Sequence, residues 1–149
     1  MLLRELILKG FNFLVDEEHF KLNVIDITHV VKEIIYSKEN ISIKISVEEM
    51  ENYFNIEIEY TSQKHKYCIS DNLPLYKECN MYSGTKDIVY KSIFELTENY
   101  ITENEFKDKV KYFYAKSKKF FKTKGALAEV IGIYGNVIKY ALRNISQIK

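Results

Sequence analysis

Carboxylate side chains gather in and beside one short segment of the chain, EEMENYFNIEIEY, at residues 48–60. Paired carboxylates can act as general acid and general base, but such catalysis needs a pocket and a shifted pKa. On an exposed hairpin the same groups are either solvated charges or a recognition surface that speeds association with a partner of opposite charge. We take this acidic group as the candidate partner-binding site and assign no catalytic residue. Its members are Glu48, Glu49, Glu51, Glu57, Glu59 and Asp71.

A second distinctive segment, KVKYFYAKSKKFFKTK at residues 109–124, combines lysines with aromatic rings. Successive residues of a helix are about 100° apart, which places Phe113, Phe120 and Phe121 on one side and spreads the lysines over the rest. An RNA-binding platform would instead expose its aromatic rings beside the basic groups. The pattern favours a helix with core-facing rings and a solvated basic back. Nucleic-acid contact and membrane-surface binding are the alternatives, because clustered lysines attract phosphate.

The chain offers few residues for metal binding or nucleophilic catalysis. His65, Cys68 and Cys79 could be combined in a zinc site, but a structural zinc site takes four ligands and no second close-spaced pair is present. No Gly-rich phosphate loop, nucleophile elbow or zinc-protease motif occurs. We therefore expect no metal site and no cofactor, and two ordinary thiols in a reducing cytoplasm.

The elements that must position the acidic group are strands. ISIKISV at residues 41–47 and FNIEIEY at residues 54–60 both alternate apolar and polar residues. Period two over seven residues, twice, predicts neighbouring antiparallel strands with one apolar and one polar face. KYCIS at residues 66–70 predicts a further strand, and residues 19–27 and 30–36 are extended in type, with a short helix within 27–35 as the alternative.

Helical spacing occurs at both ends of the chain. Residues 2–15 predict an N-terminal helix. Val89, Ile93, Leu96 and Tyr100 predict a helix that begins near residue 85. A second helix is expected from about residue 104 until Gly125 ends it, and a third over residues 126–146. Gly132 and Gly135 either permit close packing there or mark a kink. The sequence thus predicts an α+β fold: an N-terminal helix, an antiparallel sheet of about four to five strands, and three C-terminal helices packed on one face.

Size and composition bound the class of protein. With 149 residues, of which 46% are hydrophobic and 29% charged, the chain should form a single folded domain over residues 1–149. No apolar run is long enough for a membrane span, and the charged start does not match a signal peptide, so we expect a cytoplasmic protein. Residues 1–75 carry 8 Lys or Arg and 13 Asp or Glu, and residues 76–149 carry 14 and 8, so the halves have net charges of −5 and +6. This split suggests surfaces of opposite sign.

The layout of the first sixty residues resembles a known class. A helix ending FNFL, an acidic turn, HFKL, and then IIYSKENISIKI leading by a charged hairpin into FNIEIEY is similar to the small bacterial immunity-type proteins of polymorphic toxin systems, such as contact-dependent inhibition. The stretch from Tyr36 to Asn40 matches a Y-x-x-x-N pattern common in that class. The resemblance implies a non-enzymatic protein that binds a cognate toxin domain and blocks its active site. It implies no catalytic residue.

Three hypotheses about function follow. The first is an immunity protein that uses the acidic group, with a toxin that attacks nucleic acids as a fitting partner, because such toxins are often basic. The second is a nucleic-acid-binding accessory protein that uses the Lys-rich helix at residues 107–124. The third is a small enzyme whose site leaves no pattern in the sequence. The sequence leaves the oligomeric state open.

Overall fold

The computed structural model describes residues 3–26, 31–48, 53–70, 89–97, 99–116 and 124–147. The chain divides into two compact units. The helical unit consists of Met1–Phe13 and Phe94–Lys149, and the sheet unit consists of Leu14–Ile93. The predicted α+β class is confirmed, with a six-stranded sheet and helices at both ends of the chain.

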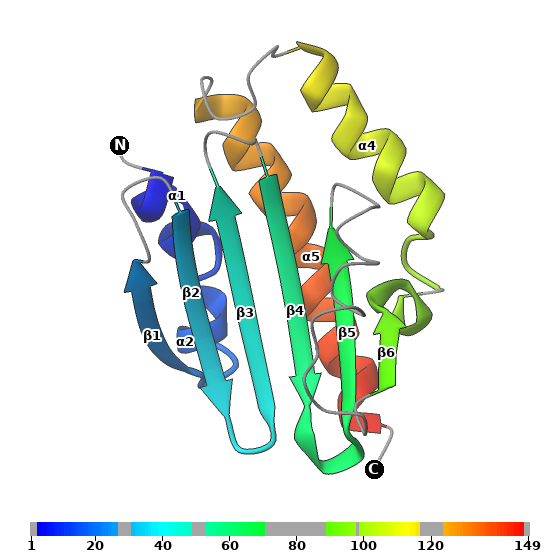
Figure 1. Ribbon diagram of the computed structural model, residues 1–149. Helices are drawn as coiled ribbons and strands as arrows, with labels where there is room; N and C mark the ends of the chain where they lie inside the picture. The colour runs from blue at the N-terminus through cyan, green and yellow to red at the C-terminus, as the bar shows by residue number, and fades with distance from the viewer. Residues whose placement is uncertain are drawn as a thin grey trace. The chain divides into compact units, whose positions relative to one another are not determined.

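The sheet unit is a six-stranded sheet in which every strand lies beside its neighbours in the sequence, in the order β1-β2-β3-β4-β5-β6 (Figure 1). The pairings from β1 to β5 are antiparallel, whereas β6 runs parallel to β5. The strands predicted at residues 41–47, 54–60 and 66–70 are confirmed, but the sheet is larger than predicted and not purely antiparallel. The strands are β1 (Lys21–Asp26), β2 (Val31–Lys38), β3 (Ile41–Glu48), β4 (Tyr53–Tyr60), β5 (His65–Ser70) and β6 (Val89–Ser92).

One face of the sheet is apolar and buried. A row of directly opposed residues crosses four strands, because Ile45 of β3 pairs with Ile34 on one side and with Ile56 on the other, and Ile56 pairs with Ile69. None of these four side chains is more than 1% exposed. Since a slip of one residue would turn every side chain to the other face, this apolar row fixes the register of β2 to β5.

The turn between β2 and β3, and its hydrogen bonds to the end of β4, hold the central strands together. Between β2 and β3, Glu39 adopts a φ of 48°, in the left-handed region that two-residue hairpin loops use. The carbonyl of Asn40 then accepts hydrogen bonds from the Thr61 N–H (2.9 Å) and the Thr61 hydroxyl (3.0 Å). The end of the first hairpin is thereby joined to the end of β4.

The prediction of a helix over residues 85–100 is wrong. Val89–Ser92 forms β6, and Ile93–Leu96 forms a single 3-10 turn (η2). The spacing of Val89, Ile93 and Leu96 fits a helix, but backbone pairing with β5 overrides that local preference, and Ile93 and Leu96 are buried as part of the turn. Residues 71–88, including the expected cap at 83–85, lie outside the described residues. The described C-terminal part contains two helices, α4 (Glu103–Lys116) and α5 (Lys124–Gln147).

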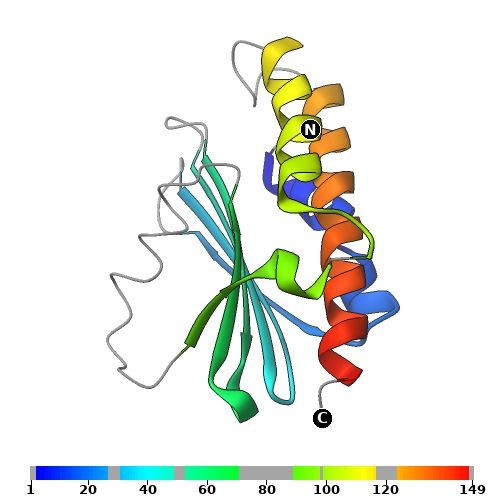
Figure 2. The same ribbon diagram turned by 90° about the vertical axis from the view of Figure 1, so that its right-hand side faces the viewer.

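In the helical unit, α1 (Leu3–Gly10) and α4 lie alongside the long helix α5 (Figure 2). A Cβ added at Gly10 would overlap the side chain of Ile131, so this glycine lets α1 approach α5 closely. Gly135 lies near the Phe13 ring, which favours close packing over a kink as its role, whereas Gly132 has open space around it. The predicted N-terminal helix is interrupted, since a separate short helix, α2 (Phe13–Asp16), follows α1.

The start of α4 is well defined. The Thr102 hydroxyl accepts a hydrogen bond from the Glu105 N–H (3.2 Å), and the Glu105 carboxylate accepts one from the Thr102 N–H (3.5 Å). This reciprocal pair is a capping box, which satisfies donors that the first helical turn leaves free. One turn on, the Phe106 ring lies between Phe94 and Tyr134, with centroid distances of 5.2 and 5.0 Å. The predicted packing of the C-terminal helices on one face of the sheet stays a prediction.

Candidate functional site

The opposite face of the sheet, called the polar face below, carries the candidate site. The register that buries the isoleucine row turns the intervening residues to this face and sets Lys44 opposite Glu57 and Glu59 opposite Ser42 and Lys66. Charged side chains from four adjacent strands therefore meet on one surface. This arrangement follows from alternation within each strand together with the cross-strand register.

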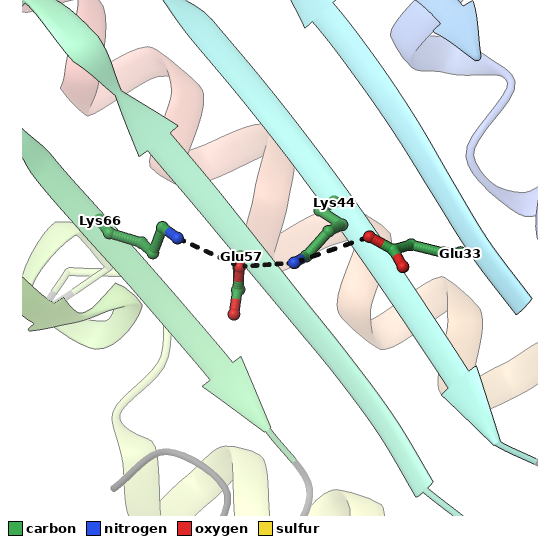
Figure 3. Close-up of polar contacts among 4 residues, drawn as sticks. All are labelled: Glu33, Lys44, Glu57 and Lys66. Carbon is green, nitrogen blue, oxygen red and sulfur yellow. Dashed lines mark ion pairs between the residues drawn. The ribbon is translucent and has the colours of Figure 1, made fainter. Parts of the chain in front are cut away.

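Four of these side chains form a charge ladder, Glu33–Lys44–Glu57–Lys66, that crosses β2, β3, β4 and β5 (Figure 3). The Lys44 Nζ lies 3.7 Å from a Glu33 oxygen and 3.4 Å from a Glu57 oxygen. The Lys66 Nζ lies 3.6 Å from the same Glu57 oxygen. Negative and positive charges thus alternate along the ladder, and each inner member contacts two partners.

The members of the charge ladder are sheltered to different degrees. The Glu57 side chain is 13% exposed and that of Lys66 19%, against 22% for Glu33 and 36% for Lys44. Coulomb attraction is stronger and salt screening weaker where water is partly excluded. The ladder should therefore hold its geometry better than an ordinary surface ion pair, with Glu57 as its central and most sheltered charge.

The ladder borders a partly open hollow of about 270 Å³ on the polar face. Ile35 supplies the apolar part of the lining, and the other side chains carry charges or, at Ser42, a hydroxyl. Ligand pockets for small molecules are mostly apolar, so this lining is better matched to a polar side chain of a protein partner. The lining residues are Glu33, Ile35, Ser42, Lys44, Glu57, Glu59 and Lys66.

Glu59 differs from its neighbours in the hollow. Its side chain is half-buried, and among the described residues it makes no hydrogen bond or ion pair, while Lys66 opposite it is directed to Glu57. A carboxylate that faces a hollow and forms no ion pair with the lysines that line it can receive a basic group from outside. Among the described side chains of the polar face, Glu59 is therefore the one best placed to receive a lysine or arginine.

The structure brings together two members of the predicted acidic group, Glu57 and Glu59, on the polar face. Glu48 ends β3, where its backbone pairs with Tyr53. Glu49, Glu51 and Asp71 lie outside the described residues. The acidic surface expected from the sequence is partly neutralised, because two lysines contact Glu57.

Sequence reasoning missed Glu33, Lys44 and Lys66 as members of the site. Lys44 was visible only as a polar residue in the alternation of residues 41–47. The signal that could have found it is the register of the hairpin, because fixing Ile45 opposite Ile56 also fixes Lys44 opposite Glu57. Opposite charges placed directly across neighbouring strands are a recurrent stabilising pair.

The Lys-rich segment is described as far as Lys116, where α4 ends. Phe106 and Val110 are buried, as expected for its core-facing side, and Lys109 and Lys111 are exposed. The Phe113 side chain and residues 117–123, with Phe120 and Phe121, lie outside the described part. The expectation that Gly125 ends this helix is wrong, because Gly125 belongs to the first turn of α5.

The residues considered for zinc have other surroundings. Cys68 is buried in β5 and forms no disulfide among the described residues, and His65 lies beside Tyr67, with 3.4 Å between the His65 Nδ1 and the Tyr67 hydroxyl. Cys79 falls outside the described residues. Within the described ranges, no cluster of three or more His, Cys, Asp or Glu side chains could hold a metal ion. Nor does any helix described here have the length and apolar character needed to cross a membrane.

A buried hydroxyl lies on the apolar face. Tyr36 is 1% exposed, and its hydroxyl has no hydrogen-bond partner among the described residues. Burial disfavours the charged phenolate and raises the pKa of Tyr36 to about 12 from its usual 10.0. The first residue of the Y-x-x-x-N stretch is thus a core residue of the sheet.

No protein-family model, curated protein or solved structure matches the chain. Its function must therefore be argued from the geometry of the polar face.

Proposed function

We propose that this chain is a non-enzymatic binding protein of immunity type, which binds a cognate toxin domain and neutralises it. The observation that carries the proposal is the charge ladder across β2 to β5, with the Glu59 carboxylate, which forms no ion pair within the described part of the chain, in the adjoining hollow. The layout of the first sixty residues, which resembles immunity proteins, supports the same reading. The proposal places the protein in the cytoplasm and needs no metal or cofactor.

The ladder suits recognition of a protein because its charges are already held by one another. Docking on such a surface costs less side-chain entropy than docking on mobile charges, because the charged side chains are already ordered. The alternation of sign also selects among partners, since a like charge opposite any member is repelled. A matching toxin surface would direct a lysine or arginine to Glu59 and acidic groups to Lys44 or Lys66.

The proposal expects a toxin domain to be encoded immediately upstream of this chain, and the test uses the product of that coding region. We expect the two proteins to form a stable complex of one to one and the chain to protect cells that express the toxin. Glu59→Lys should weaken binding at least ten-fold, because it replaces the carboxylate that receives the incoming basic group with a like charge, beside Lys44 and Lys66 of the same hollow. Glu39→Lys, the same charge change at an exposed hairpin residue, is the matched control and should bind normally.

Isothermal titration calorimetry measures both dissociation constants, and growth assays measure protection. Absence of a complex with that toxin, or equal weakening by the two variants, would overturn the assignment of the polar face. Circular dichroism of each variant establishes that the fold is retained.

A second candidate function is nucleic-acid binding by the Lys-rich helix at residues 107–124, favoured by the exposure of Lys109 and Lys111 on α4. It requires retention on DNA or RNA at low salt with a steep loss as salt rises. A gel-shift assay at about 50 mM salt, where such contacts are strongest, separates the two functions. Binding that Lys109→Glu with Lys111→Glu abolishes would favour the second function, and no shift would eliminate it.

A further inference from the structure

The two lysines of the charge ladder are divided unevenly between the two glutamates that β4 carries on the polar face. Both lysines contact Glu57, with 3.4 Å from the Lys44 Nζ and 3.6 Å from the Lys66 Nζ to the same Glu57 oxygen. Glu59 lines the same hollow but makes no ion pair among the described residues. One carboxylate therefore holds two cations while its neighbour on the strand holds none.

The register of the strands predicts a different division. Lys44 is directly opposite Glu57, and Lys66 is directly opposite Glu59. Directly opposed side chains on one face are the closest, with Cβ atoms about 4.5–5.5 Å apart, against about 7–8 Å for diagonal neighbours. Direct opposition would give each glutamate one lysine, but the Lys66 ammonium takes the diagonal to Glu57 instead (Figure 3).

Two features of the polar face favour this diagonal contact. The residue of β5 directly opposite Glu57 is Cys68, which is buried and uncharged, so β5 places no cation directly across from that carboxylate. Glu57 is also the most sheltered member of the charge ladder, at 13% exposed, and attraction between charges is stronger where water is partly excluded. The diagonal contact satisfies Glu57 and leaves Glu59 facing the hollow.

We propose that Glu57 is a positioning residue for the partner site: it draws the Lys66 ammonium away from the opposed Glu59 and so keeps the Glu59 carboxylate open to a cation of the partner. Lys66 is an internal competitor for Glu59, which it occupies once Glu57 loses its charge. The incoming cation in this inference rests on the proposed function. The pairing of Lys66, in contrast, is measured without any partner.

The first experiment identifies the contacts of Lys66 by zero-length cross-linking of the full chain. A carbodiimide activates a carboxylate, a lysine amine in contact with it displaces the urea, and the resulting amide is located by peptide mass spectrometry. In the wild type we expect Lys66 to be joined to Glu57 in preference to Glu59. In Glu57→Gln the yield of the amide between Lys66 and Glu59 should rise about five-fold, which is the upper range for a partly exposed ion pair.

Glu33→Gln is the matched control, because it makes the same change at the far end of the charge ladder, where Glu33 contacts Lys44. It should leave the cross-links of Lys66 at their wild-type ratio. Equal joining of Lys66 to both glutamates in the wild type, or an unchanged yield of its amide with Glu59 in Glu57→Gln, would overturn the proposal. The wild-type pattern tests the first step without any substitution, and thermal melts establish that each variant is folded.

The second experiment measures toxin binding in a double-mutant cycle. Glu57→Gln should weaken binding, and adding Lys66→Met should then recover about five-fold in affinity, because it removes the competitor for Glu59. In the wild-type background Lys66→Met should give no such gain. A direct contact of Lys66 with the toxin, or its net charge, acts alike in both backgrounds and cancels in the cycle. Equal effects of Lys66→Met in the two backgrounds would therefore contradict the role assigned to Glu57.

The two experiments separate this inference from the proposed function. Transfer of Lys66 to Glu59 in Glu57→Gln, in a chain that binds no toxin, would refute the toxin-binding proposal and support the hold of Glu57 on Lys66. Toxin binding through Glu59, in a chain whose Lys66 does not move to Glu59 in Glu57→Gln, would refute this inference alone.

Discussion

The two faces of the sheet use the same strands and alternate residues, yet they differ in what holds them together. On the apolar face, Ile34, Ile45, Ile56 and Ile69 form a row that water does not reach. On the polar face, the charge ladder crosses the same four strands and stays between 13% and 36% exposed. The apolar face therefore supplies stability, whereas the polar face supplies a fixed pattern of charge, on which the proposed recognition of a partner depends.

The largest effect should come from the centre of the apolar face. Ile45→Ala removes a fully buried side chain from the middle of the row, and we expect the free energy of unfolding to fall by about 2–5 kcal/mol. Ser46→Ala, the next residue on the same strand and on the polar face, should change it by less than about 0.5 kcal/mol. Urea denaturation followed by circular dichroism measures both. Similar losses for the two variants would contradict the inference that the apolar face supplies most of the stability.

A smaller effect should distinguish two glutamates on the polar face. Glu57→Gln removes the carboxylate that Lys44 and Lys66 share, which leaves two half-sheltered ammonium groups near each other. We expect a loss of about 1–2 kcal/mol in the free energy of unfolding, between the values typical of exposed and buried pairs. Half-molar salt should reduce that loss, since it screens the repulsion between the two lysines.

Glu59→Gln is the matched control for this prediction, because it makes the same change on the same strand and face. Glu59 makes no ion pair among the described residues, so its replacement should alter stability by less than about 0.5 kcal/mol. It should weaken only toxin binding. If Glu57→Gln proves as harmless as Glu59→Gln, the charge ladder does not hold its geometry in solution.

The sequence was sufficient to predict those elements whose local residue pattern agrees with their place in the folded chain. β3 and β4 alternate strictly, so their strands and their buried sides could be predicted from residue types alone. The segment from Val89 to Leu96 shows the opposite case. Its apolar residues have helical spacing, but pairing with β5 decides its conformation, and that pairing joins residues more than twenty positions apart. Local periodicity carries no information about such a partner.

The candidate site was predictable only in part, for a related reason. Composition pointed to Glu57 and Glu59 as acidic surface residues, but it could not show that lysines from two neighbouring strands contact Glu57. Those contacts depend on register, which the sequence fixes through the isoleucine row and not through the charged residues themselves. A prediction from charge counts alone therefore overestimates how acidic the polar face is.

The smallest effect concerns the polar atom on the apolar face, the Tyr36 hydroxyl. It is buried and has no hydrogen-bond partner among the described residues, so Tyr36→Phe should leave stability at neutral pH unchanged or raise it by up to about 1 kcal/mol. Tyr100→Phe, which removes an exposed hydroxyl, should have no effect and serves as the control.

The pKa of Tyr36 determines how the effect of this substitution on stability should change with pH. The pKa of Tyr36 is about 12 in the folded chain against 10.0 when unfolded, so between these values the unfolded state binds fewer protons and stability falls as pH rises. Tyr36→Phe removes the part of this fall in stability that comes from ionisation of Tyr36. At pH 11 its advantage over the wild type should therefore have grown by about 1 kcal/mol relative to pH 9. An advantage that stays constant across this range would mean that water reaches the Tyr36 hydroxyl, and that the apolar face is less closed than its isoleucine row indicates.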